Sequence, residues 1–283
     1  MKSLTDTYTL QNGVEIPCIG LGTWQVPDGE LAYNAVRDAL SLGYRHVDTA
    51  AVYGNEASVG QAVRESGIPR EEIFVTSKLW NSVRGYKETH EAFEETLKKL
   101  GLEYLDLYLI HWPNPAGFRN VWKEANAETW RAMEDLYKAG RIRAIGISNF
   151  LQHHIDALLE KAEVVPMVNQ VRLCPGDAKE DLVAYCRGHG MLLEAYSPFG
   201  TGKAFEVPEL QEMAAKYNKS VAQVLVRWSL QMGFLPLPKS AKAARIKENA
   251  DVFDFELDED NVAHLAGMTG ACGLSSDPDT VTW

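Results

Sequence analysis

Asp48, Tyr53, Lys78 and His111 form a set of side chains that could together move a proton. A phenol, with an ordinary pKa of about 10, is a poor acid at neutral pH. A buried ammonium within reach would favour the phenolate and lower that pKa, and a carboxylate would hold the ammonium charged and aimed. His111 could then hydrogen-bond to a carbonyl oxygen and orient it. Such a set suits the protonation of an alkoxide as it forms, which is the chemistry of carbonyl reduction.

These residues are spaced as successive strands of a parallel sheet would space them. Strand-like runs end near Asp48 ("YRHVDT"), Lys78 ("IFVTSKL") and His111 ("LDLYLIHW"). The steps of 30 and 33 residues between them each match one strand–helix unit. Strands in register would therefore bring the three side chains to one rim, with Tyr53 just above. Taken singly, the four could be a helix cap, a surface aromatic, a solvated lysine and a core histidine, but their joint pattern favours a site.

Strand-like and helix-like segments alternate along the chain. Stretches such as "GELAYNAVRDALSLG" and "YKETHEAFEETLKKLG" carry apolar residues at three- and four-residue steps and end at Gly43 and Gly101, and a third ends at Gly140. Apolar strands separated by such helices indicate a parallel sheet covered on the outside. Eight units predict an α/β fold, the (β/α)8 TIM barrel. An open doubly wound sheet is the alternative, because periodicity does not prove closure. The predicted strands are 18–22, 44–49, 73–79, 105–112, 142–149, 166–171, 191–197 and 234–238.

The start of the chain predicts a separate feature. Asn12-Gly13 in "YTLQNGVEIP" is a favoured tight-turn pair between two short β-like runs, so we expect an N-terminal β-hairpin. No low-complexity linker or shift of composition follows it, and we expect a single domain over residues 1–283.

Composition and charge narrow the class of protein. The net charge is −11 without a block of Lys or Arg, so nucleic acid and acidic membranes are not expected as partners. The longest apolar runs fall far short of the roughly 20 residues that span a bilayer, and the start lacks a signal-peptide core. Four scattered cysteines without CxxC spacing suit a reducing compartment. We expect a cytoplasmic monomer that acts on a small molecule.

A possible phosphate site follows the last predicted strand. Lys239, Ser240 and Arg245 in "LPKSAKAARIKENA" stand beside a helix N-terminus, and barrels often bind phosphate after strands seven and eight. The chain lacks a G-x-G-x-x-G motif after a strand, so a Rossmann fold is not favoured. Taken alone, the basic cluster could equally serve solubility.

The whole chain resembles an aldo-keto reductase, a family of NADPH-dependent barrel oxidoreductases. The resemblance rests on "GLGTW", "HVDTAAVYGNE", "SKLW", "LIHWP", "IGISNF", "NQV", "AYSPFG" and "PKSAKAARIKEN", which occur in the family's order and spacing. It implies NADPH-dependent reduction of aldehydes and ketones to alcohols, a reversible reaction. It also implies that Tyr53 is the general acid of a catalytic tetrad with Asp48, Lys78 and His111.

The resemblance also implies binding residues. Ser148, Asn149 and Gln170 match the positions that bind the nicotinamide carboxamide, and Tyr196 the position that stacks on the ring. Trp24, Trp80 and Trp112, beside His111, would form an aromatic substrate cleft. The other cofactor positions are Gly22, Thr23, Trp24 and Asp48 near the ring, Ser197 and Phe199 at the pyrophosphate, Lys239, Ser240 and Arg245 at the 2′-phosphate, and Glu248 and Asn249 at the adenine.

Two residues depart from the family pattern. After the sixth strand the family commonly reads Asn-Gln-x-Glu-x-His-Pro, whereas "NQVRLCPG" places Arg172 and Cys174 at the Glu and His positions. Arg172 could favour an anionic substrate, although a side chain pointing outward from a surface loop is the favoured interpretation. The loops after "HWP" and at the C-terminus are short, so the resemblance indicates the reaction better than the substrate.

Other functions remain as alternatives. Lys78 could form a Schiff base in a lyase with Tyr53 as proton shuttle, although this leaves "PKSAKAAR" unexplained. A non-catalytic NADPH-binding sensor subunit is the second alternative. No metal site is expected, because the seven histidines lack HxH and HxxxH spacing and we expect His153 and His154 to point to different sides of a helix.

Overall fold

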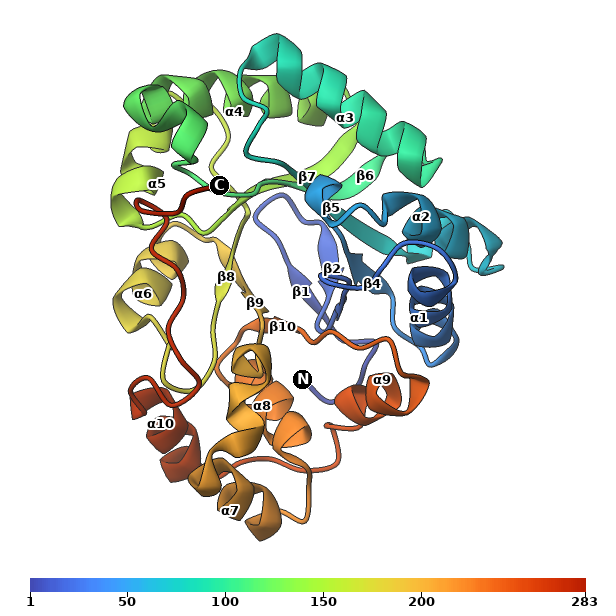
Figure 1. The fold of residues 1–283 in the computed structure, drawn as a ribbon, viewed down its shortest axis with the longest axis vertical. Helices are drawn as coiled ribbons and strands as arrows, with labels where there is room; N and C mark the ends of the chain where they lie inside the picture. Colours follow the sequence, from blue (N-terminus) through green and yellow to red (C-terminus); the bar gives the residue numbers. More distant parts are fainter.

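The core of the protein is a parallel sheet that closes on itself. The computed structural model describes residues 1–283, and its eight-stranded sheet runs in chain order from β3 to β10 (Figure 1). A bridge between Gly22 and Lys239 joins the first strand to the end of the last, and the N–H of Gly22 donates to the carbonyl of Pro238 at 3.1 Å. The predicted barrel is therefore confirmed, and the alternative of an open doubly wound sheet is excluded. Its strands are β3 Leu21–Gly22, β4 His46–Asp48, β5 Phe74–Leu79, β6 Leu105–Ile110, β7 Ile142–Ser148, β8 Val168–Arg172, β9 Leu192–Tyr196 and β10 Leu235–Leu237.

Helices surround the sheet (Figure 1), and most of them bury one face against the core. In α3, for example, Phe93, Leu97 and Leu100 are buried at three- and four-residue steps, and Gly101 ends the helix in the left-handed conformation at φ 63°. The helices are α1 Glu30–Ser41, α2 Glu56–Glu65, α3 Tyr86–Leu100, α4 Trp122–Lys138, α5 Gln152–Leu159, α6 Glu180–Gly188, α7 Pro208–Lys216, α8 Val221–Gln231, α9 Ala243–Ala250 and α10 Glu259–Gly267.

The N-terminal hairpin covers one end of the barrel. Strands β1 (Thr7–Thr9) and β2 (Glu15–Pro17) pair antiparallel around the predicted turn, where Gly13 has φ 82°. Asn12 Nδ2 donates to the carbonyl of Arg143, and the Tyr8 hydroxyl donates to that of Phe234, each at 2.9 Å. Both carbonyls lie at the start of a strand, so the hairpin closes the N-terminal end. Its apolar residues pack into the barrel interior in a buried cluster that contains Leu10, Ile16, Phe74, Leu107, Leu109, Ala144, Met167, Val168, Leu235 and Leu237.

Several strands differ in length from the prediction. The predicted 18–22 strand is reduced to Leu21–Gly22, because the N–H of Cys18 donates to the carbonyl of Asp6 and pairing with the last strand begins only at Gly20. The predicted runs to 149 and 112 stop at Ser148 and Ile110, and Asn149 turns away with φ 62°. β8 instead runs one residue beyond its predicted end, to Arg172. The hydrophobic segments therefore predicted where the strands lie, but not the residues at which the hydrogen-bonded pairing of the strands ends.

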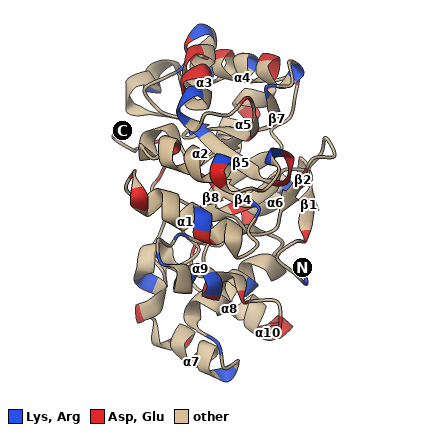
Figure 2. Cartoon of the chain, turned by 90° about the vertical axis from the view of Figure 1, so that its right-hand side faces the viewer, with Lys and Arg blue, Asp and Glu red and all other residues tan.

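Charged residues of both signs are mixed over the outer helices (Figure 2). Many form exposed pairs within a helix, such as Lys87 with Glu91 at 3.5 Å. None of the helices is both long and apolar enough to cross a membrane.

Candidate active site

Lys78 is the centre of a buried ion pair at the C-terminal end of the barrel. Its Nζ lies 2.6 Å and 2.8 Å from the two carboxylate oxygens of Asp48, and 2.9 Å from the carbonyl of Thr49. β4 and β5 pair in parallel register, which brings Asp48 opposite Thr76 and close to Lys78 two residues further on. The side chain of Lys78 is fully buried, so its charge is compensated entirely by these groups.

Tyr53 completes the set from the short helical turn Ala51–Tyr53 that follows β4. Its hydroxyl lies 3.4 Å from Lys78 Nζ. The ring of His111 lies 5.9 Å from that of Tyr53 in an edge-on arrangement, with Trp80 on its other side at 5.1 Å. The structure thus brings together Asp48, Tyr53, Lys78 and His111 as the strand spacing predicted.

Burial and charge act in opposite directions on these groups. Burial lowers the pKa of the Lys78 ammonium, but Asp48 and Tyr53 more than offset this and raise it above its ordinary value. Burial raises the pKa of Tyr53 above its ordinary value, and the neighbouring Lys78 lowers it as expected but opposes the effect of burial only in part. Burial, followed by the charge of Lys78, lowers the pKa of His111 well below its usual range. His111 is therefore neutral at pH 7.

Tyr53 and His111 face a cavity of about 770 Å³ at this end of the barrel, a size typical of sites for small molecules. Most of the predicted cofactor residues lie on its wall: Gly22, Trp24, Asp48, Ser148, Asn149, Gln170, Tyr196, Ser197, Phe199 and Lys239. Thr23, Ser240, Arg245, Glu248 and Asn249 do not line it. Thr23 instead donates a hydrogen bond from its hydroxyl to the carbonyl of Asp48 at 2.9 Å.

Hydrogen bonds within the protein hold the polar side chains on the wall of the cavity in place. Ser148 Oγ donates to the carbonyl of Gln170 at 2.7 Å, and Asn149 Nδ2 donates to the carbonyl of His111 at 3.0 Å. The Tyr196 hydroxyl donates to Asn149 Oδ1 at 2.8 Å, which holds the hydroxyl end of the ring on the wall. Gln170 Nε2 donates to Asp48 Oδ2, so the amide is tied to the ion pair as well. These polar side chains are therefore already oriented to bind a flat ring that carries an amide.

The basic cluster follows β10, at the edge of the cavity. Lys239 is exposed and lines the cavity, and Arg245 is exposed in the first turn of α9. Neither forms an ion pair within the protein, and the buried Ser240 accepts a hydrogen bond from the N–H of Lys242 at 3.0 Å. Two uncompensated cations beside a helix N-terminus suit a phosphate group.

The predicted aromatic cleft gains a residue that the sequence did not indicate. Trp24, Trp80 and Trp112 all line the cavity, and Trp283 stands edge-on to Trp112 with ring centroids 5.7 Å apart. The carbonyl of Trp283 accepts from the N–H of Ala116 at 3.3 Å. No motif marked this residue, because its place depends on contacts with loops far away in the chain. Other lining residues outside the prediction include Lys203, Phe205, Leu274 and Ser275.

Arg172 points inward, contrary to the favoured interpretation of a surface side chain. It ends β8, is only 6% exposed and lines the cavity. Its Nη1 donates to Asp177 Oδ2 at 3.1 Å and to the carbonyl of Gly273 at 2.6 Å, and Nη2 donates to that of Cys272 at 2.6 Å. The guanidinium therefore ties the C-terminal segment to β8 and forms an ion pair with Asp177, which also pairs with Lys179 at 2.9 Å. Cys174 is a buried free thiol nearby.

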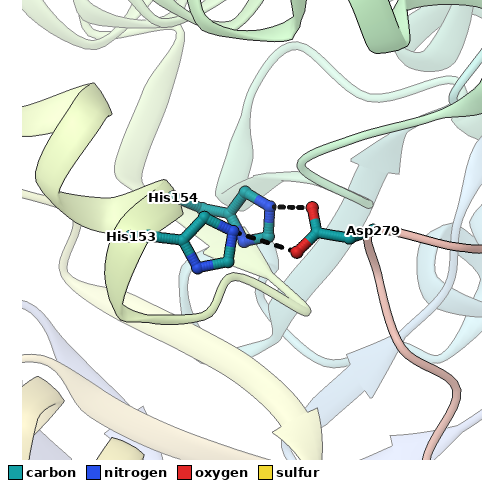
Figure 3. Close-up of side chains that lie close together, drawn as sticks. All are labelled: His153, His154 and Asp279. Atoms are coloured by element: carbon teal, nitrogen blue, oxygen red, sulfur yellow. Dashed lines mark hydrogen bonds and ion pairs between the residues drawn. The ribbon is translucent and has the colours of Figure 1, made fainter.

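His153 and His154 do not point to different sides of α5, so that expectation was wrong (Figure 3). Both rings meet Asp279 of the C-terminal segment, with Nε2–oxygen distances of 3.0 Å and 2.9 Å. The N–H of Leu151 donates to His154 Nδ1, so His154 Nε2 carries the proton that it gives to Asp279. A metal-bound imidazole usually donates from its other nitrogen instead. The cluster therefore suits a hydrogen-bonded tie more than a set of metal ligands.

The closed barrel with an ion-paired lysine, a tyrosine and a histidine at one end is the arrangement expected of an aldo-keto reductase. Residues 18–269 match the sequence model of the Aldo/keto reductase family, and the chain belongs to this family. It is 49% identical over 277 residues to glyoxal reductase of Bacillus subtilis, covering 98% of each chain.

Solved structures agree with this assignment. The crystal structure of an aldo/keto reductase from Brucella melitensis is 44% identical and superposes with a TM-score of 0.88, over 94% of this chain and 98% of that one. A variant of Gox0644 in complex with NADPH is 36% identical, with a TM-score of 0.90 over 99% of each chain.

Proposed function

We propose that this protein reduces aldehydes and ketones to alcohols with NADPH, with Tyr53 as the general acid. The observation that carries the proposal is the contact of the Tyr53 hydroxyl with Lys78, which Asp48 holds charged beneath a cavity lined by His111. Membership of a family that includes a glyoxal reductase supports the reaction class. The reaction is reversible, since the same groups can accept the proton.

Each side chain has a distinct part in this proposal. NADPH, when bound, supplies the hydride. Tyr53 donates its proton to the developing alkoxide, and the neighbouring Lys78 ammonium stabilises the phenolate that is left. Asp48 keeps Lys78 charged and in place. Neutral His111 donates a hydrogen bond that orients the carbonyl oxygen, because a neutral imidazole still carries one N–H.

The cavity wall offers groups that suit NADPH. Ser148, Asn149 and Gln170 would bind the carboxamide, and Tyr196 would stack on the nicotinamide. Lys239, Ser240 and Arg245 would hold the 2′-phosphate, since the two cations have no partner in the protein. Ser197 and Phe199 would meet the pyrophosphate, Glu248 and Asn249 the adenine, and Gly22, Thr23 and Trp24 would border the ring. A complex of a structural relative with NADPH supports this cofactor.

The substrate we propose is a small or medium carbonyl compound with an apolar portion, such as an aldehyde or an α-dicarbonyl. Trp24, Trp80 and Trp112 give the cavity an apolar wall around Tyr53 and His111. Such walls discriminate weakly, by about 1–3 kcal/mol for each methylene, so we expect a broad range of substrates. The glyoxal reductase relative supports a dicarbonyl among them.

The Schiff-base alternative is less favoured by the geometry. A nucleophilic amine must be neutral and accessible, whereas Lys78 is fully buried and its pKa is raised above the ordinary value by Asp48 and Tyr53, despite the opposing effect of burial. Borohydride trapping of a substrate on Lys78 would revive it. A non-catalytic sensor would bind NADPH without turnover.

The deciding experiment incubates the protein with NADPH and a panel of aldehydes, ketones and 2-oxo acids. Loss of NADPH absorbance with formation of the alcohol is the expected result. Binding of NADPH without turnover of any compound would favour the sensor, and no binding would contradict the proposal. Size-exclusion chromatography and limited proteolysis of the same sample would check the predictions of a monomer and of a single domain; a cytoplasmic location stays a prediction from composition.

A further inference from the structure

Glu194 is a buried carboxyl in the barrel interior that the proposed reaction leaves without a part. It lies in the middle of β9, opposite Gln170 of β8 and Leu235 of β10, and has no exposed surface. Apolar residues line the interior next to the hairpin, with His46 and Thr76 as buried polar neighbours. A carboxyl placed there is costly unless it serves a purpose or holds a proton.

One amide joins Glu194 to the active site. Gln170 Nε2 donates to Glu194 Oε2 and to Asp48 Oδ2, each at 2.8 Å. With both of its protons used, the nitrogen fixes the amide, and the Gln170 side chain lines the cavity where we place the nicotinamide. Glu194 is therefore one residue away from the ion pair and one residue away from the cofactor ring.

The charges around Glu194 do not balance if it is ionised. Lys78 is the one cation in this interior, and it already pairs with Asp48. His46 Nε2 lies 3.9 Å from Glu194 Oε1, beyond hydrogen-bond distance, and burial followed by the charge of Lys78 lowers the pKa of His46 to about 3. Oε1 has no hydrogen-bond partner. Burial, followed by the charge of Asp48, raises the pKa of Glu194 to about 8, so the group holds a proton at neutral pH.

We propose that the Glu194 carboxyl is a buried proton store that makes the relative affinity of the site for oxidised and reduced nicotinamide depend on pH. This inference rests on the proposed function. An oxidised nicotinamide ring carries a positive charge that the reduced ring lacks. The oxidised ring therefore favours the ionised carboxylate, and the proton of Glu194 passes to solvent, whereas the reduced ring leaves the proton in place. Glu194 touches neither substrate nor cofactor, and acts as a positioning residue through Gln170 and Asp48.

Binding and proton release are linked, so either can be measured without turnover. In weakly buffered solution near pH 8, NADP⁺ should release more protons on binding than NADPH does. The nucleotides share their phosphates, so the difference between them isolates the ring. Tryptophan fluorescence would measure the two dissociation constants. As Glu194 ionises, the affinity for NADP⁺ relative to that for NADPH should rise by about fivefold or more, which is the lower end of ordinary coupling between sites.

Glu194→Gln should remove both effects, because the amide keeps the shape of the side chain and cannot titrate. Glu56→Gln is the matched control. Glu56 is also buried with a pKa raised by burial, but it accepts its hydrogen bond from Ser77 at 2.7 Å and makes no contact with Gln170. This control should behave as the wild type.

Besides the absence of a difference between the nucleotides in the wild type, two results would overturn the inference. One is an equal difference in proton release in the wild type and in Glu194→Gln. The other needs no variant: carbon-13 NMR of the glutamate carboxyls in the wild type would show whether a buried carboxyl titrates near pH 8, and ionisation of Glu194 in the ordinary acidic range would exclude a proton store. If the wild type binds neither nucleotide, the proposed function fails and takes this inference with it; nucleotide binding without the difference removes only the inference.

Discussion

The two sides of the active-site cavity are held in different ways. On one side, Asp48 and Lys78 lie on β4 and β5, and His111 follows β6, so the parallel register of the sheet fixes their relative positions. The other side includes the C-terminal segment 272–283, which contains no helix or strand. Side chains hold it there, chiefly those of Arg172 and of His154 at Asp279. Substitutions in the first group should change chemistry without moving atoms, whereas those in the second should change the shape of the cavity.

The largest effect should come from the sheet-held side. Tyr53→Phe removes the proton donor, so kcat should fall by at least about 100-fold, the usual lower share of general acid catalysis. The dissociation constant of NADPH should stay unchanged, because the phenol ring is retained. Steady-state kinetics would measure kcat, and fluorescence titration would measure the dissociation constant of NADPH. Unchanged turnover would show that Tyr53 is not the acid.

A double variant tests whether this side works as a unit. Lys78→Met should also lower kcat strongly, because the ammonium acts through Tyr53. The combined loss in Tyr53→Phe/Lys78→Met should then be far smaller than the product of the two single losses. Multiplying losses would mean that the two residues act independently.

The cofactor end should show the next largest effect. Arg245→Ala should weaken NADPH binding by about tenfold or more, since a hydrogen bond to a charged group contributes about 1.5–3 kcal/mol. NADH lacks the 2′-phosphate, so its affinity should change little. Isothermal titration with both nucleotides measures this, and equal losses would show that Arg245 does not meet the phosphate.

Substitutions in the C-terminal segment's side of the cavity should mainly change KM. Arg172→Ala removes the hydrogen bonds of the guanidinium to Asp177 and to the C-terminal segment, and Asp177 keeps Lys179 as its ion-pair partner. This loss should lower the free energy of unfolding by about 1.5–3 kcal/mol, the usual contribution of hydrogen bonds to a charged group. The looser wall should raise KM for a neutral aldehyde and for a carboxylate-bearing aldehyde of similar size by the same factor, because the Arg172 guanidinium already bonds to Asp177 and to the carbonyls of Gly273 and Cys272.

Asp177→Asn separates recognition from support in this wall. It frees the guanidinium charge without removing the side chain. A gain for the carboxylate-bearing aldehyde in this variant, with a matching loss in Arg172→Ala, would assign Arg172 to substrate recognition and contradict a purely structural part.

The last effect should appear as a slope of the free energy of unfolding against pH. Between pH 4.5 and about 8 the folded protein keeps a proton on Glu194 that the unfolded chain has lost. Stability should therefore fall as the pH rises through this window, by at most about 1.4 kcal/mol for each pH unit. His46 acts in the opposite sense, because the unfolded chain holds a proton between about 3 and 6.5 that the folded ring lacks. Urea midpoints should thus decline from pH 6.5 to 8 in the wild type and stay flatter in Glu194→Gln; an identical decline in both would contradict this.

The comparison also shows what could be predicted from the sequence. The barrel and the four central residues were predictable because strands recur at a fixed interval and their ends share one edge. Trp24, Trp80 and Trp112 followed from the resemblance to the aldo-keto reductase family. In each case a local pattern was enough to place the residue.

Trp283, the orientation of Arg172 and the meeting of His153 with His154 were not predictable in this way. Their places depend on contacts across about a hundred residues or more, such as Arg172 with the carbonyl of Cys272. The pairing of both histidines with Asp279 also required a partner from outside the helix. The net pKa of Tyr53 depended on the depth of burial, which a spacing cannot give.

The hairpin that closes the N-terminal end also constrains the order in which the chain can fold. Tyr8 bonds to the carbonyl of Phe234, and Gly22 pairs with Lys239. The N-terminal segment is synthesised first, but it cannot form these contacts until residues near the C-terminal end have been synthesised. At roughly 5–20 residues per second, a ribosome needs on the order of 10–50 s to make the intervening chain. During that time Phe74 and Leu107 on β5 and β6 lack the neighbours that cover them in the finished barrel. Newly made chains should therefore depend on chaperones until β10 emerges, although the finished protein does not.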